Sequence, residues 1–142
     1  MLITSQQQTF KNFLFIGWNG RTKMVIEILS GLFEGIDITL IDETLENTPF
    51  ENENIKFIKG VPMYDGTLLE ANIENKDVVI ITADQYQNEQ NADKKSIISL
   101  LSIKGMKPSV YTIVEIQTSE QVNNAKRAGA NEIIRSSKIA SD

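Results

Sequence analysis

Residues 12–20 read NFLFIGWNG, an apolar run that passes directly into a glycine turn. A strand, a glycine turn and a following helix form the start of a nucleotide-binding βαβ unit. In the G-x-G-x-x-G register Gly17 is present, but Asn19 stands at the second glycine position and Thr22 at the third. The stretch therefore predicts a nucleotide-binding fold with an altered fingerprint, and the function depends on what such a turn still binds.

Along the rest of the chain, short apolar runs alternate with helical patterns. Strands are predicted near residues 12–17, 36–41, 55–59, 77–82, 109–115 and 131–134, and helices near 20–34, 66–72, 89–104 and 118–128. Strands such as DVVIIT at 77–82 are continuously apolar, which is typical of parallel strands buried on both faces. We expect the α/β class, a Rossmann-like doubly wound parallel six-stranded sheet with helices on both faces.

The amino-acid composition argues against several classes of function. The 142 residues, 41% of them hydrophobic, suit one globular domain, and we expect a flexible leader at 1–11 before a domain at 12–142. A net charge of −5 argues against a nucleic-acid partner. The chain has no cysteine or histidine, which removes thiol chemistry and the usual neutral-pH proton shuttle. No apolar run approaches the roughly 20 residues of a membrane helix, so a cytoplasmic domain is expected.

In a doubly wound sheet, ligands bind outside the carboxyl ends of the strands, where the strand order reverses. The residues that follow the first five predicted strands are therefore the candidate binding residues, with no catalytic or metal-binding residue among them. They are Gly17, Trp18, Asn19, Gly20, Arg21 and Thr22 after the first strand, Asp42 and Glu43 after the second, Gly60 after the third, Thr82, Ala83 and Asp84 after the fourth, and Glu115 after the fifth.

Each part of this set suits a part of a nucleotide. Gly17 allows a tight turn before a helix N-terminus that favours phosphate, and Asn19 tolerates left-handed backbone and can donate a hydrogen bond. Arg21 is either a phosphate contact or a solvated cation, and Trp18 either stacks on a base or packs across the turn. Asp42, 25 positions after Gly17, would accept hydrogen bonds from ribose hydroxyls and repel a 2′-phosphate. NAD or an adenosine nucleotide is favoured over NADP, and the alternative is that the turn is only a turn.

Longer motifs resemble a known family. They are GWNGRT at 17–22, LIDE at 40–43, FIKGVPMYDGTLLEANIENKDVVIITAD at 57–84, SVYTIVEI at 109–116 and RAGANEII at 127–134. Together they resemble the RCK domains (regulators of potassium conductance), the cytosolic gating modules of bacterial potassium channels and Trk/Ktr-type transporters. The turn is similar to that of the channel branch. The resemblance implies a regulatory domain in which ligand binding changes packing within a ring and pulls on the pore.

The resemblance also implies ligands. Relatives bind NAD or NADH, ATP, ADP or AMP in the cleft, and some bind calcium through acids near the fourth and fifth strand ends. Glu115 matches one such acid, but Ala83 and Gln117 replace two others, so calcium is less favoured. A glycine–aspartate pair that contacts the nucleotide in transporter relatives reads Gly60-Val61 here.

One predicted helix has more apolar surface than a helix that packs only on the sheet requires. Residues 96–106, SIISLLSIKGM, are apolar around much of one helix, and RCK domains pair through the helices after the fourth and fifth strands. We expect a homodimer competent for larger, octameric rings with the full module, attached to a potassium channel pore on the inner face of the membrane. From the resemblance, we expect residues 12–142 to be the N-terminal domain of the module, without its C-terminal subdomain. Residues 89–95 are predicted to be solvated surface.

Two other functions remain open from the sequence. One is a fragment of an NAD-dependent oxidoreductase, which would need an acid or base for hydride transfer; without histidine or cysteine, no catalytic spacing is recognisable. The other is a structural assembly module with an empty cleft. The sequence favours a sensor, not an enzyme.

Overall fold

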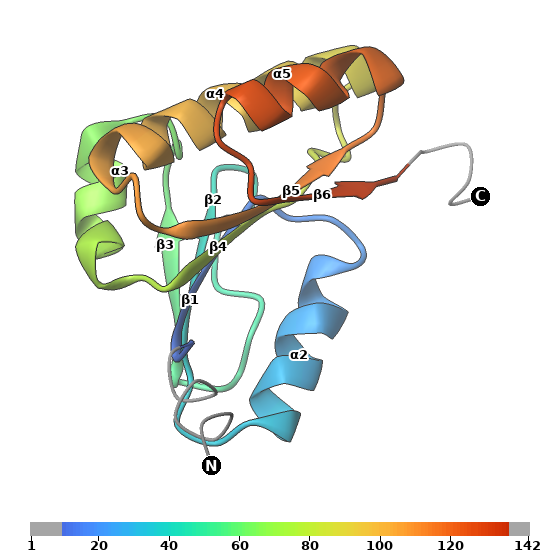
Figure 1. Cartoon of the computed structure of the whole chain (residues 1–142). Helices are drawn as coiled ribbons and strands as arrows, with labels where there is room; N and C mark the ends of the chain where they lie inside the picture. The colour runs from blue at the N-terminus through green and yellow to red at the C-terminus, as the bar shows by residue number, and fades with distance from the viewer. Residues whose placement is uncertain (1–9, 137–142) are drawn as a thin grey trace.

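The fold is a six-stranded parallel sheet, seen in a computed structural model that describes residues 10–136 (Figure 1). The strand order is β3-β2-β1-β4-β5-β6, so the chain moves outward from β1 in one direction and then returns to continue in the other. The predicted doubly wound sheet is confirmed. The strands are β1 (Asn12–Ile16), β2 (Asp37–Asp42), β3 (Ile55–Lys59), β4 (Val78–Ile81), β5 (Tyr111–Ile116) and β6 (Glu132–Arg135).

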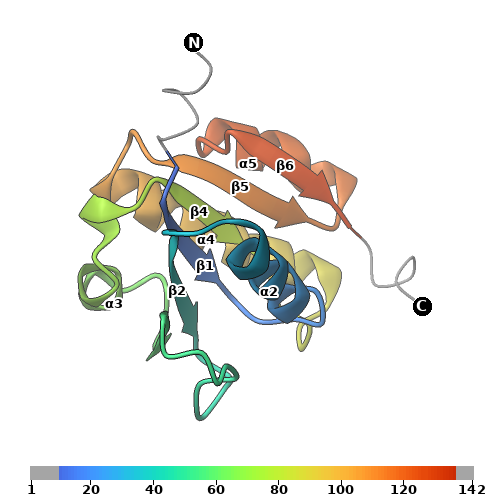
Figure 2. The same ribbon diagram turned by 90° about the horizontal axis from the view of Figure 1, so that it is seen from below.

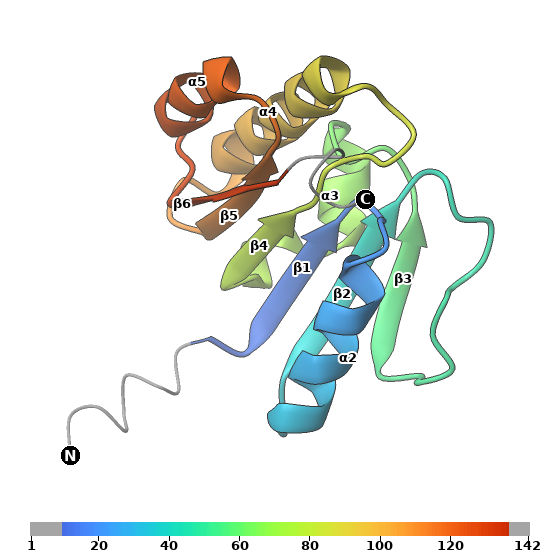
Figure 3. The same ribbon diagram turned by 90° about the vertical axis from the view of Figure 1, so that its right-hand side faces the viewer.

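Helices cover both faces unequally. α3, α4 and α5 lie on one face, and α2 lies alone on the other, as the perpendicular views make plain (Figures 2 and 3). Residues 43–54, between β2 and β3, form an irregular loop. The helices are α2 (Thr22–Leu32), α3 (Asp65–Glu70), α4 (Glu89–Met106) and α5 (Val122–Arg127), with 3₁₀ turns η1 (Ile73–Asn75) and η2 (Ser119–Gln121).

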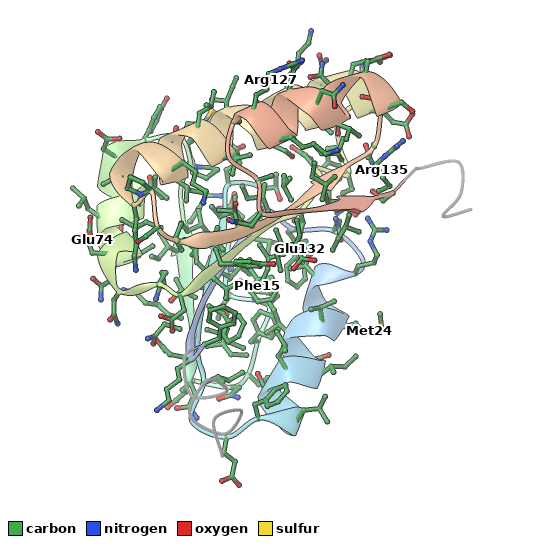
Figure 4. All side chains as sticks on the ribbon, in the orientation of Figure 1. Phe15, Met24, Glu74, Arg127, Glu132 and Arg135 are labelled. Atoms are coloured by element: carbon green, nitrogen blue, oxygen red, sulfur yellow. The ribbon has the colours of Figure 1, made fainter. Side chains whose placement is uncertain are left out.

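Two apolar clusters hold these layers together, because successive side chains of a strand point to opposite faces. Leu14 and Ile16 of β1 pack toward the larger cluster with Leu100 and Ile103 of α4. Phe15 points the other way, toward Ile26 of α2, and all six side chains are at most 2% exposed. The side-chain view shows Phe15 between the sheet and α2, with Met24 on the outer side of that helix (Figure 4).

Element boundaries differ from the predicted ones by a few residues. Helix α2 begins at Thr22, not at residue 20, because Gly20 and Arg21 belong to the turn that leaves β1. The helix predicted at 118–128 is a 3₁₀ turn followed by the short α5. Most of the predicted leader, residues 1–9, lies outside the described residues.

The prediction that residues 89–95 form solvated surface is wrong at one decisive position. Asp93 of α4 is completely buried. Its carboxylate accepts hydrogen bonds from the backbone N–H groups of Gln117 (2.8 Å) and Thr118 (2.8 Å) and from the Thr118 hydroxyl (2.6 Å). Asp93 is therefore an internal clamp that fixes α4 to the end of β5, whereas Gln90, Asn91 and Lys94 are exposed as predicted.

Candidate functional site

The strand order reverses at β1, which lies between β2 and β4. Parallel strands all end on the same edge, so the loops that follow β2, β1 and β4 meet at one place. Thr82 N–H donates to the carbonyl of Ile16 (2.9 Å), and Gly17 N–H donates to that of Ile41 (2.9 Å). These bonds continue the sheet ladder into the loops and hold the three strand ends in a fixed crevice.

Gly17 is a glycine for a geometric reason. Its φ of +91° lies in the left-handed region, and a Cβ placed on it would come within 2.8 Å of the Thr82 hydroxyl and 3.0 Å of the Thr82 carbonyl oxygen. The bare backbone lets the turn after β1 pass directly against the end of β4. The first glycine of the fingerprint therefore retains its expected structural role.

Asn19, at the second glycine position, turns its side chain into the protein. It is 5% exposed, and its Oδ1 accepts a hydrogen bond from Arg21 N–H (2.9 Å). Its amide Nδ2 donates to the carbonyl of Ala83 (3.0 Å) and to Glu115 Oε1 (3.1 Å). Thr22, at the third position, donates its hydroxyl to Asn19 Oδ1 (3.3 Å). The departures from the fingerprint thus stabilise the turn from within.

Glu115, near the end of β5, joins this strand to the loops after β1 and β4. Its Oε1 accepts hydrogen bonds from Ala83 N–H (2.7 Å) and from Asn19, and its Oε2 forms an ion pair with Arg21. The Glu115 side chain is 8% exposed, whereas that of Arg21 is 48% exposed. The Glu115 carboxylate orders the turn because these groups bind it. The positive charge of Arg21 faces this carboxylate.

Asp42 ends β2 and is 4% exposed. Its Oδ2 accepts hydrogen bonds from Thr44 N–H (2.7 Å), the Thr44 hydroxyl (2.6 Å) and Leu45 N–H (2.8 Å). Within residues 10–136, the Asp42 carboxylate accepts these hydrogen bonds through Oδ2 alone. The acid therefore shapes the start of the β2–β3 loop with one oxygen while its side chain lines the crevice.

The crevice encloses a cavity of only about 30 Å³ above the end of β1. Six of the thirteen predicted binding residues line it, namely Gly17, Trp18, Asp42, Glu43, Thr82 and Asp84. The remaining seven, Asn19, Gly20, Arg21, Thr22, Gly60, Ala83 and Glu115, are not in the lining. The rest of the wall comes from the strand ends, Pro62 and α4, through Ile16, Ile41, Pro62, Ile81, Lys95, Ser96 and Ser99.

Two predicted residues have local packing roles. Trp18 meets Phe50 of the β2–β3 loop edge to face, with ring centroids 5.8 Å apart, which matches the expected packing across the turn. Gly60 follows β3, and a Cβ there would come within 2.9 Å of the Thr67 methyl group. Gly60 thus allows the close approach of α3.

Lys95 of α4 was not among the predicted site residues. Its ammonium donates a hydrogen bond to Asp84 Oδ2 (2.8 Å) and forms an ion pair with Glu43. Burial alone would lower the pKa of Lys95, but the hydrogen bonds with Asp84 and Glu43 outweigh it and raise the pKa. No local pattern marks Lys95 in the sequence, because its neighbours Lys94 and Ser96 are polar as well.

The lining carries more negative than positive charge. Asp42, Glu43 and Asp84 supply three carboxylates, and Lys95 supplies one ammonium. The hydroxyl groups in the wall belong to Thr82, which donates to the Ile16 carbonyl (3.0 Å), and to the two serines of α4. Carboxylates and hydroxyls of this kind bind sugar hydroxyls and amines by hydrogen bonding.

The described part of the chain, residues 10–136, contains no group of three or more acidic side chains placed to hold a metal ion together. None of its helices combines the length and the apolar character needed to cross a bilayer.

The chain is similar in sequence to a known domain family and to a curated protein. The TrkA-N domain model matches residues 13–136. A curated relative, "Putative potassium channel protein YugO" of Bacillus subtilis (strain 168), is 46% identical over 128 residues. The match covers 90% of this chain and 39% of the relative, so the chain spans well under half of that protein's length.

Solved structures share the fold at low sequence identity. The TrkA-N domain of the inner membrane protein ybaL from Escherichia coli superposes with a TM-score of 0.76 at 14% identity, covering 93% of this chain and 92% of that one. The GsuK channel bound to NAD gives a TM-score of 0.71 at 16% identity, covering 89% of this chain and 21% of that one. GsuK has also been solved bound to ADP.

Proposed function

The chain belongs to the TrkA-N domain family, and from this premise we propose that it is the nucleotide-sensing regulatory domain of a potassium channel. The resemblance to RCK domains that the sequence motifs indicated is confirmed by the family match and by the similarity to YugO. In this proposal a ligand in the crevice changes the packing of the domain, and the change is passed to a pore elsewhere in the assembly.

One observation carries the nucleotide part of the proposal. A glycine turn after β1 and an acid at the end of β2 line the same cavity, at the point where strand order reverses. Asp42 would accept hydrogen bonds from a ribose through Oδ1, since Oδ2 is engaged by Thr44 and Leu45. Phosphate would lie at the Gly17 turn. The proposed ligands are NAD, NADH or an adenine nucleotide such as ATP, ADP or AMP.

The predicted binding residues fall into two groups according to whether they line the cavity. We assign direct contact to the six that line the cavity, and a supporting role to the loop residues behind them. Asn19, Arg21, Thr22, Ala83 and Glu115 hold the turn through their mutual hydrogen bonds. Gly20 is exposed and Gly60 packs on α3, so neither is assigned a contact.

Binding without turnover is proposed. Hydride transfer requires an acid or base positioned beside the substrate carbonyl. The one ammonium in the cavity lining is shared by two carboxylates, and the acids at the strand ends have positions suited to ribose recognition. The arrangement supports a sensor better than an oxidoreductase.

Self-association is proposed through α4 and α5. Ile98 and Leu101 of α4 are 48% and 53% exposed, although the neighbouring Leu100 and Ile103 are completely buried. Ile98 and Leu101 line an open groove together with residues of the η2–α5 segment, namely Gln121, Asn124, Arg127 and Ala128. A second copy covering this groove would give the homodimer, and rings of such domains would lie at the inner face of the membrane beside the pore.

Calorimetric titration with NAD and with ADP tests the nucleotide proposal. We expect saturable binding by the wild-type chain, weakened about tenfold in Asp42→Asn because one charged hydrogen bond to the ribose is lost. Asparagine is chosen over alanine because its Oδ1 can still accept from Thr44 and Leu45 N–H groups.

Asp65→Asn is the matched control, since Asp65 is an exposed acid of α3 that does not line the cavity. It should bind like the wild type. Absence of binding of both nucleotides to the wild-type chain would contradict the proposal, and equal binding by Asp42→Asn would contradict the role of Asp42.

A further inference from the structure

Three charged side chains from three separate elements meet over the cavity. Glu43 follows β2, Asp84 follows β4, and Lys95 lies on α4. We refer to this Glu43–Lys95–Asp84 arrangement as the Lys95 bridge. The strands β2 and β4 lie on either side of β1, about 10 Å apart at the usual strand spacing. The bridge therefore spans the end of β1, directly above the Gly17 turn.

The bridge has little access to solvent compared with ordinary surface ion pairs. The side chains of Lys95, Asp84 and Glu43 are 26%, 12% and 31% exposed. Partial burial strengthens the attraction between opposite charges, because less water screens them. The Tyr86 N–H donates to Asp84 Oδ1 (2.9 Å), which orients this carboxylate, so its Oδ2 can meet the lysine.

The cavity below the bridge is too small for the proposed ligand. Its volume is about 30 Å³, whereas clefts for ligands of this size are on the order of 300 Å³ or more. All three members of the bridge line this cavity. A ligand seated over β1 must therefore displace Lys95 from at least one of its carboxylates.

We propose that the Lys95 bridge is an autoinhibitory contact that holds the nucleotide crevice closed and that a ligand must break in order to bind. The inference rests on the proposed nucleotide site and adds its regulation. Opening separates the β2 loop from α4, so the bridge couples ligand entry to the helix that also carries the exposed Ile98 and Leu101. A closed state that predominates lowers the apparent affinity by the fraction of molecules that are open.

Two substitutions break the bridge from opposite sides. Lys95→Met makes the crevice more negative and Glu43→Gln makes it less negative, yet both remove the ion pair that closes it. Adenosine is the appropriate probe because it is uncharged. We expect both variants to bind adenosine about threefold to tenfold more tightly than the wild type, the scale of a partly buried ion pair. The control is Lys126→Met, an exposed lysine of α5 outside the cavity lining.

Hydrogen–deuterium exchange measures the opening without any ligand. We expect faster backbone exchange in residues 43–48 and 83–88 of Lys95→Met and Glu43→Gln, with no change in Lys126→Met. Equal exchange in all forms would overturn the bridge as a closing contact. The bridge would also be overturned if the two variants leave the adenosine affinity unchanged but shift the ADP affinity in opposite directions. That pattern would reflect only the changed charge of the crevice acting on a charged ligand.

The two proposals fail in different ways. If the wild type binds ADP but neither exchange nor adenosine affinity responds to the variants, the nucleotide site stands and the autoinhibitory bridge is overturned. If exchange rises in both variants while neither the wild type nor any variant binds ADP, NAD or adenosine, the nucleotide proposal is overturned together with the role of the bridge in ligand entry.

Discussion

Gly17 is the residue on which the crevice depends. Its left-handed φ and the 2.8 Å approach to the Thr82 hydroxyl leave no room for a Cβ. We predict that Gly17→Ala lowers the free energy of unfolding by about 2–3 kcal/mol, from left-handed strain and the contact with β4. Urea denaturation followed by circular dichroism measures this change.

Gly20, three residues along the same turn, provides the matched control. A Cβ there would meet no atom within 4 Å, and its φ is not left-handed. Gly20→Ala should leave the free energy of unfolding unchanged or raise it slightly. Equal destabilisation by both substitutions would contradict the assigned role of Gly17.

Individual site residues could be predicted from sequence where a local pattern defines them. Gly17 and Asp42 follow from a glycine turn and an acid at the end of the next strand. Asn19 was expected to face a ligand, but its side chain turns inward because it donates hydrogen bonds to Ala83 and Glu115, which lie more than 60 residues away in the chain. Lys95 was missed because only the packing of α4 against the strand ends brings it to the cavity.

At the scale of the elements, Asp93 joins α4 to the end of β5. It is fully buried, and three hydrogen bonds reach its carboxylate from Gln117 and Thr118. In Asp93→Asn an amide group replaces one acceptor oxygen and faces an N–H or O–H donor. We predict a loss of about 1–3 kcal/mol in the free energy of unfolding, the cost of unpaired buried donors.

Thermal and urea denaturation of Asp93→Asn beside Asp65→Asn checks this prediction. The second variant makes the same chemical change at an exposed acid of α3 and should alter stability by no more than about 0.5–1 kcal/mol. If Asp93→Asn is as stable as the wild type, the clamp does not contribute to the attachment of α4.

The elements themselves were largely predictable, because continuous apolar runs define buried parallel strands. Boundaries at α2 and α5 were displaced because turn geometry decides them. The interpretation of residues 89–95 as solvated was wrong at Asp93, since a buried acid paired with backbone N–H groups looks like a surface acid in a sequence.

At the scale of the whole molecule, the α4–α5 groove predicts self-association. Ile98→Glu should convert a dimer to a monomer, because a carboxylate cannot be buried without a partner. Stability should change little, since Ile98 is 48% exposed in the single chain. Sedimentation equilibrium measures the mass directly.

Leu69→Glu on α3 is the control for this prediction. Leu69 is 61% exposed and does not line the groove, so the substitution should leave the dimer intact. A wild-type chain that remains monomeric at high concentration would contradict this surface, and so would a dimer that persists in Ile98→Glu.

The family and the overall architecture could be predicted from motifs spread along the chain, whereas the closed state of the crevice could not. Closure depends on the side chains of Glu43, Asp84 and Lys95, which three different elements bring together. A ligand site formed at strand ends is predictable in position from topology, but its accessible volume depends on side-chain packing.

A nitrogen–proton correlation spectrum recorded during an ADP titration locates the ligand on the domain. We expect saturable shifts of the Gly17, Trp18, Glu43 and Thr82 amide signals, with those of Asn124 and Ala128 in the α4–α5 groove unchanged at constant oligomeric state. Shifts confined to the groove, or a spectrum unchanged by ADP and by NAD, would contradict a nucleotide-sensing crevice over β1.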